Sequence, residues 1–287
     1  MQRFPTPAPD RFAALWRSLS AIGYLPGAGC TRSAWSEDDL AAREWFTEEA
    51  LDRDLTVEPD RHGNLYAWWG DPAAGPAVLT GGHLDSAPGG GRYRGALGVV
   101  SALLAIDILR EWGYTPSRPI GVAVFAATDG ARFGAPCAGA RLLTGDLTRA
   151  AAGRLRDRDG VTFTEALTPT LPPPRSGGRA VDLAASGAPD ADEPDRLARI
   201  GAFVELHLDP GRTVAAMDAP VGIGGGAWAG RRWRLAVTGT RNHVGSTAMA
   251  DRADPTLTVA YAILAASKEA RRLGAHAGVG RVGTHPG

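Results

Sequence analysis

The stretch LTGGHLDSAPGGGRYRGALGV, residues 79–99, decides the fold that we expect for the chain. An apolar run at 77–80 leads into the triplet HLD (83–85) and a glycine-rich turn, and a long apolar segment, Gly95–Trp112, follows. A short apolar run bounded by glycines is typical of a buried strand, whereas an apolar segment as long as 95–112 is typical of a helix. The stretch therefore predicts a strand, a polar loop at its end, and a buried helix.

On either side of this stretch, helical and strand patterns alternate. Apolar residues recur at helical spacing over 11–22, and Ser36 followed by Asp39 has the pattern of a capping box for a helix through Leu51. Further strand patterns lie at 64–69 and 120–125. Alternation of this kind predicts an α/β fold, with helices on both faces of the sheet.

The alternation stops at residues 167–195, where proline, glycine and acidic residues dominate and we expect a surface excursion. A strand pattern returns at 202–208. Two more strand patterns and one helix pattern follow, at 221–223, 233–237 and 256–272. We expect two domains, an α/β domain over 1–212 and a smaller domain of strands and helix over 213–287.

The composition is that of a globular protein without net charge. The 287 residues include 31 Lys and Arg against 31 Asp and Glu, which excludes a global attraction to nucleic acid or anionic membranes. The N-terminus lacks the apolar run of a signal peptide, and no stretch approaches the ~20 apolar residues of a membrane span. Cys30 and Cys137 are too far apart for a metal knuckle. We therefore expect a cytoplasmic protein without nucleic-acid or membrane partners.

Taken singly, the motifs each allow two interpretations. His83 with Asp85 fits a metal ligand with its orienting carboxylate, but a histidine at a strand end is more often structural. The glycine run at 222–226 fits a phosphate loop, but no GK[ST] follows, which favours a tight turn. The chain has no GxSxG motif, so nothing supports a serine hydrolase of that type.

Taken together and in order, five segments resemble the M20-type metallo-amidohydrolases, and among them the hydantoinase/carbamoylase branch with its N-carbamoyl-amino-acid and allantoate amidohydrolases. The segments are GCTRSAWSEDDLAAREWF (29–46), the stretch at 79–99, FAATDGARFGAPCAGARLLTG (125–145), VELHLDPG (204–211) and HVGSTAMADRADP (243–255). The resemblance covers nearly the whole chain. It implies a mixed-sheet catalytic domain of the zinc-peptidase type and a smaller α+β lid domain through which the family forms homodimers.

In the family, the chain returns after the lid to complete the catalytic domain and to supply the last metal-binding histidine. Residue 287 lies within the lid pattern, so we expect this return segment to be missing. An open sheet edge or apolar face would then remain in the catalytic domain, and we expect self-association to cover it.

The resemblance also implies two divalent cations, of Zn²⁺ or else Mn²⁺, Co²⁺ or Ni²⁺, that activate a water molecule for attack on a small amide or ureido substrate. His83 matches the first metal ligand, Asp85 the carboxylate that orients it, and His207 a second ligand of the same ion. His243 matches the lid histidine that steadies the oxyanion across the dimer. The alternative for His243 is a loop histidine bonded within its own turn.

Three matched positions depart from the family pattern. Arg94 stands where the bridging aspartate is expected, and Thr128 and Asp129 stand where two glutamates supply the general base and a ligand. A guanidinium stays protonated and cannot bind a cation, and a threonine hydroxyl does not ionise near neutral pH. Asp129 remains a candidate ligand. We expect Arg94 to pair with Asp129 or Asp85, its charge replacing that of the metals, so that none binds.

Two functions from different classes stay open. By resemblance, the chain is a metal-dependent hydrolase of linear C–N bonds, such as those of N-carbamoyl amino acids, with an impaired active site. By the chemistry of its altered positions, it is a non-catalytic pseudoenzyme that binds a ligand or forms a dimer. A rebuilt site for a single ion, held by His83, His207 and Asp129, lies between the two.

Overall fold

The computed structural model describes residues 9–167, 193–209, 211, 213–217, 219–226 and 229–284, with only the backbone of 193–195. The chain divides into two units, Met1–Pro220 and Val221–Gly287. Our expected boundary, after residue 212, falls slightly earlier. Most of the expected excursion at 167–195 lies outside the described residues.

Helices and strands alternate along the first unit. Their order is α1 (Pro9–Ser20), β1 (Tyr24–Leu25), β2 (Gly29–Cys30), α2 (Glu37–Leu51), β3 (Thr56–Pro59), β4 (Leu65–Trp69), β5 (Ala77–Gly82), α3 (Ala96–Glu111), β6 (Ile120–Val124), α4 (Ala138–Leu143), α5 (Arg149–Ala152), α6 (Phe163–Leu167), α7 (Glu193–Ala198), β7 (Ile200–Val204) and α8 (Thr213–Ala216). The strand, loop and helix predicted from residues 79–99 are confirmed as β5, its following loop and α3. Ser36 caps α2 by accepting a hydrogen bond from the amide of Asp39, as its pattern predicted.

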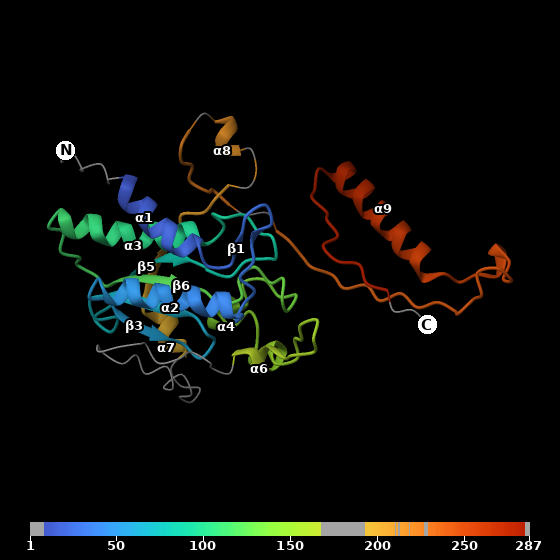
Figure 1. Cartoon of the computed structure of the whole chain (residues 1–287), viewed down its shortest axis with the longest axis horizontal. Helices are drawn as coiled ribbons and strands as arrows, with labels where there is room; N and C mark the ends of the chain where they lie inside the picture. The colour runs from blue at the N-terminus through green and yellow to red at the C-terminus, as the bar shows by residue number, and fades with distance from the viewer. Residues whose placement is uncertain are drawn as a thin grey trace. The chain divides into compact units, whose positions relative to one another are not determined.

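A mixed five-stranded sheet, in the order β3-β4-β6-β5-β7, forms the centre of the first unit (Figure 1). The β3–β4 and β4–β6 pairs are antiparallel, whereas β5 runs parallel to both β6 and β7. Because β5, β6 and β7 run in the same direction, the loops that follow them leave from one edge of the sheet. This edge brings together the segments that begin at His83, Phe125 and Glu205.

Apolar side chains pack on both faces of this sheet. The larger core lies between the sheet and α1, α2 and α3, and it joins Leu65 and Ala67 of β4 with residues of all three helices in one cluster. Tyr66 and Trp68 alternate with them and so face the opposite side, in a smaller cluster. There the guanidinium of Arg196, from α7, lies 5.0 Å from the centre of the Tyr66 ring. Helices therefore contact both faces, as the alternating pattern predicted.

In the second unit, the expected helix forms and the expected strands do not. Helix α9 (Pro255–Leu273) begins after the capping residue Asp254 and follows the short 3₁₀ helix η2 (Met249–Asp251). The strands predicted at 221–223 and 233–237 were wrong, since neither segment is a strand in the described part of this unit. A strand needs a hydrogen-bonded partner, and these segments have none there.

In the first unit, β7 is shorter than predicted, since it ends at Val204 and does not reach residue 208.

The described helices include none that is long and apolar enough to cross a membrane.

A close approach of α3 to β5 explains a glycine in the first turn of a buried helix. A Cβ atom on Gly98 would overlap the main-chain oxygen of Gly81. We expect Gly98→Ala to lower the free energy of unfolding by about 1–3 kcal/mol, because overpacking outweighs the roughly 1 kcal/mol by which Ala favours a helix over Gly. Gly91→Ala, which meets nothing within 4 Å, is the matched control and should change it by less than about 0.5 kcal/mol. Urea unfolding measures both, and an unchanged or more stable Gly98→Ala protein would contradict the packing argument.

Candidate functional site at the sheet edge

The ring of His83 is fixed in one orientation directly after β5. Its Nδ1 lies 2.8 Å from the main-chain oxygen of Asp85 and 3.5 Å from the Asp85 carboxylate. Because a carbonyl oxygen only accepts, Nδ1 carries the proton, and in the neutral ring Nε2 keeps its lone pair. The ring also lies against Gly95, at the start of α3, where any Cβ atom would overlap it. The backbone thus orients His83 more directly than the carboxylate that we expected to do so.

The buried Asp85 carboxylate joins two loops. Its oxygens accept hydrogen bonds from the amide of Thr128 at 3.1 Å and from that of Asp129 at 2.9 Å. Burial acts to raise the pKa of Asp85, but the hydrogen bond and charge of His83 and the two amides outweigh burial and lower it. Burial likewise acts to lower the pKa of His83, and its interactions with Asp85 raise it instead. The two side chains therefore form a mutually stabilising pair.

The loop after β6 adopts a conformation that it would avoid on its own. Ala127 is buried and has φ 49°, in the left-handed region that costs a non-glycine residue about 1–2 kcal/mol. The turn at Ala127 places the amides of Thr128 and Asp129 on the same carboxylate. The Thr128 hydroxyl is itself used locally, since it donates to the carbonyl of Phe125 at 3.3 Å.

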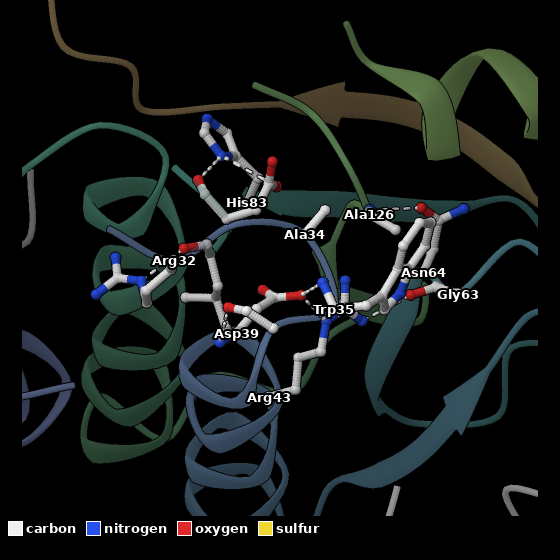
Figure 2. Close-up of polar contacts among 12 residues, drawn as sticks. Arg32, Ala34, Trp35, Asp39, Arg43, Gly63, Asn64, His83 and Ala126 are labelled. Atoms are coloured by element: carbon white, nitrogen blue, oxygen red, sulfur yellow. Dashed lines mark hydrogen bonds and ion pairs between the residues drawn. The ribbon is translucent and has the colours of Figure 1, made fainter. Parts of the chain in front are cut away.

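The buried residue Arg32 anchors the segment after β5 through hydrogen bonds (Figure 2). Its Nε donates to the carbonyl of Leu84 at 2.7 Å, and its amide donates to the Ser86 hydroxyl at 3.0 Å. The Ser86 amide in turn donates a hydrogen bond to the Arg32 carbonyl at 2.7 Å. Residues 83–86 are therefore anchored independently of any ligand. Arg32 lies in the matched segment at 29–46, but the motif alone did not predict this role.

A shallow pocket of about 10 Å³, roughly the space that one water molecule needs, opens beside these groups. Polar members of its lining are Ser33, Asp85, Ser86, Asp129 and Arg132. The Arg132 guanidinium donates to the Asp157 carboxylate at 3.0 Å. The lining therefore includes a positively charged donor as well as negatively charged acceptors. This volume is far below the usual range of about 300–1,000 Å³ for ligand sites, so the pocket itself has room for no more than a water molecule.

The third strand-end segment brings His207 and Glu205 to the same edge. His207 is exposed, and its Nδ1 lies 3.5 Å from a Glu205 carboxylate oxygen. Glu205 also acts on the charge of His83, whose pKa it helps to raise. Glu205 was not among the predicted site residues, although it lies two residues before His207 in the matched segment at 204–211.

The expected ion pair of Arg94 with Asp85 or Asp129 does not form. Arg94 lies exposed in the turn before α3, and it has no ion pair among the described residues. The Asp85 carboxylate is buried and already occupied by two amides and His83. Moving the guanidinium into that environment would cost desolvation, whereas in the turn it stays in water.

His243 belongs to the second unit and is exposed. Its Nδ1 accepts a hydrogen bond from the Gly245 amide at 3.2 Å and lies 3.1 Å from the Ser246 hydroxyl. These contacts match the alternative that we gave for it, a loop histidine bonded within its own turn.

The side chains expected to bind metal do not form a metal site. In the part of the chain that the structure describes, no three His, Cys, Asp or Glu side chains are placed to hold one ion. His83 and the amide of Asp129 are both tied to Asp85, while His207 stays exposed beside Glu205. The residues present therefore do not fit the pair of cations that the family resemblance implies.

Comparison with known proteins identifies consistent relatives. No family model matches the chain. It is 31% identical over 278 residues to a ureidoglycolate hydrolase of Arabidopsis thaliana, covering 94% of this chain and 56% of that protein. It is 31% identical over 286 residues to an N-carbamoyl-L-amino acid amidohydrolase of Geobacillus stearothermophilus, covering 95% and 64%. A crystal structure of a hydantoinase/carbamoylase family amidase from Burkholderia ambifaria matches 91% of this chain and 61% of its own, with 26% identity and a TM-score of 0.60. The chain thus spans little more than half the length of such relatives.

The hydrogen bonds by which Asp85 bridges the loops after β5 and β6 can be tested directly. Asp85→Asn replaces one acceptor oxygen with a donor that faces an amide, and we expect it to lower the free energy of unfolding by about 2–3 kcal/mol at pH 7. Since the folded state lowers the pKa of Asp85, its stabilisation is present above the ordinary value of about 4 and is lost as the pH falls. The difference between wild type and variant should therefore narrow on acidification. Asp159→Asn, at an exposed position, is the control. A difference that is absent or constant with pH would refute the bridge.

Proposed function

Because the chain belongs to the hydantoinase/carbamoylase family of amidohydrolases, we propose that it binds a small ureido or carbamoyl compound at the edge where β5, β6 and β7 end, and that its own hydrolysis of the C–N bond is impaired. Members of this family hydrolyse ureido and carbamoyl C–N bonds. The charged and polar side chains gathered beside Asp85, among them Ser86, Asp129 and Arg132, support a polar substrate of this class at that edge.

Arg94 is the observation that carries the impairment. It occupies the position matched to the bridging aspartate, so one negative charge is replaced by one positive charge. Even with the dielectric constant of water and a separation of about 5 Å, this change disfavours a bound dication by about 3 kcal/mol, or more than a hundredfold in affinity. His83 does not replace the lost negative charge, since a neutral imidazole binds a cation through its lone pair alone.

Thr128 adds a second defect, at the position of the general base. A threonine hydroxyl takes up no proton near neutral pH, and here the hydroxyl donates to the Phe125 carbonyl. General-base assistance is worth about 10²–10⁴ in rate. Substrate binding at this edge requires neither the metals nor the base, so binding is expected to outlast hydrolysis.

A homodimer is a further part of the proposal. Three large apolar side chains of α9, those of Leu257, Tyr261 and Leu264, follow one helical face at spacings of four and three residues. All three are exposed, with the Tyr261 side chain 71% accessible. An exposed apolar stripe of this kind supports association with a second copy.

A charge-reversal series tests the impairment. We expect wild type to show no turnover of N-carbamoyl amino acids above the uncatalysed rate, and Arg94→Asp to bind Zn²⁺ or Mn²⁺ at least about a hundredfold more tightly than wild type in equilibrium titrations. Arg92→Asp makes the same charge change two residues away and is the control. Turnover by wild type would refute the impairment. An equal gain in Arg92→Asp would show a general charge effect and would remove Arg94 from the argument.

A separate measurement tests the dimer. Size-exclusion chromatography with light scattering should give twice the chain mass of 29.9 kDa. Leu264→Glu should shift the protein toward the monomer, because it places a charge in the apolar stripe. A wild-type protein that stays monomeric at high concentration would contradict this part of the proposal.

A further inference from the structure

We infer that Asn64, a buried residue outside every matched motif position, is the positioning residue for the loop that carries Thr128 and Asp129 to the site. The inference rests on the proposed function only in taking this sheet edge as the binding site. Figure 2 shows Asn64 beside Ala126, the residue at which β6 passes into the loop.

The Asn64 side chain links three parts of the chain. Its Oδ1 accepts the Ala126 amide at 2.9 Å, and its Nδ2 donates to the carbonyl of Gly139 at 3.2 Å and to Asp60 at 2.6 Å. An amide group offers one acceptor oxygen and two N–H donors, so these partners fix its orientation and use both donors. Asn64 is 0% exposed, so no water competes for these bonds.

Asp60 holds Asn64 in place. Its Oδ1 accepts the amides of His62 and Asn64, at 2.9 and 2.8 Å, and its Oδ2 accepts the Asn64 side chain and the Tyr66 hydroxyl. The turn between β3 and β4 is thereby locked around the asparagine. Asn64 thus acts from a rigid support and not from a mobile loop.

The backbone of the loop shows why one side chain can position it. The carbonyls of Ala126, Ala127 and Thr128 accept the amides of residues 139, 138 and 137 in turn, at 2.9, 3.2 and 2.9 Å. The amides of Thr128 and Asp129 go to Asp85. The Ala126 amide has a side-chain partner instead, and that partner is Asn64.

The loop is therefore held at its far end by Asp85 and at its near end by Asn64, with the strained Ala127 between them. Removing the near anchor frees Ala126 to rotate, and this rotation carries the two following amides away from Asp85. A second observation ties Gly139 to the same contact. A Cβ atom there would overlap the Asn64 oxygen, so only glycine allows the asparagine to bridge β6 and α4.

Amide hydrogen exchange, followed by two-dimensional NMR without added metal or ligand, tests the inference. In Asn64→Ala, we expect the amides of Thr128 and Asp129 to exchange at least about tenfold faster relative to the amides of β6. Gly139→Ala keeps every polar group but displaces the asparagine, so it should give the same local effect. It decides the question if Asn64→Ala does not fold.

Ser18→Ala is the matched control, because it removes another internal hydrogen bond, that with the Trp45 ring nitrogen, away from the site. It should leave the ratio unchanged. A folded variant in which Thr128 and Asp129 lose no more protection than β6 would overturn the inference, since a merely structural role lowers all protection together. The exchange ratio does not depend on substrate binding or turnover. The inference about Asn64 and the proposed function can therefore fail separately.

Discussion

The site depends on the two hydrogen bonds that the Asp85 carboxylate accepts from the amides of Thr128 and Asp129. It connects the end of β5 to the end of β6, and it holds a loop whose residue at position 127 has an unfavourable backbone conformation. A buried carboxylate is costly unless it is fully paired, and here protein groups alone pair it. The edge of the sheet consequently has a defined geometry that no bound cation is needed to maintain.

This arrangement is consistent with our proposal that a member of an amidohydrolase family keeps its architecture while its hydrolysis is impaired. The anchors of the edge, Asp85 and Arg32, form hydrogen bonds with main-chain groups. The altered positions are different in kind, because Arg94 lies in solvent and Thr128 bonds only locally through its hydroxyl. Substitution at such positions costs the fold little, and in our proposal it removes the charge and the base of the family reaction.

Much of the frame follows from local sequence signals, and the contacts of the site do not. The apolar run before His83 and the long apolar segment after Gly95 sufficed to predict β5 and α3, and Ser36 sufficed to place the start of α2. The predicted strand at 233–237 failed because alternation cannot reveal whether a partner strand is present. The pairing of Arg94 failed because a sequence does not show that Asp85 is already occupied by amides. Asn64 gave no signal beyond its place after a glycine in a turn, since its role arises from segments far apart in the chain.

We propose above all that this edge is organised by protein groups and has lost its affinity for divalent cations. Elemental analysis of the purified chain, after expression with Zn²⁺ and Mn²⁺ and removal of loosely bound ions, tests it most directly. The account predicts far less than one ion per chain, with the fold unchanged by chelation. One or more tightly bound ions per chain, lost on substitution of His83 or His207, would contradict it and would show that the metal site has been rebuilt.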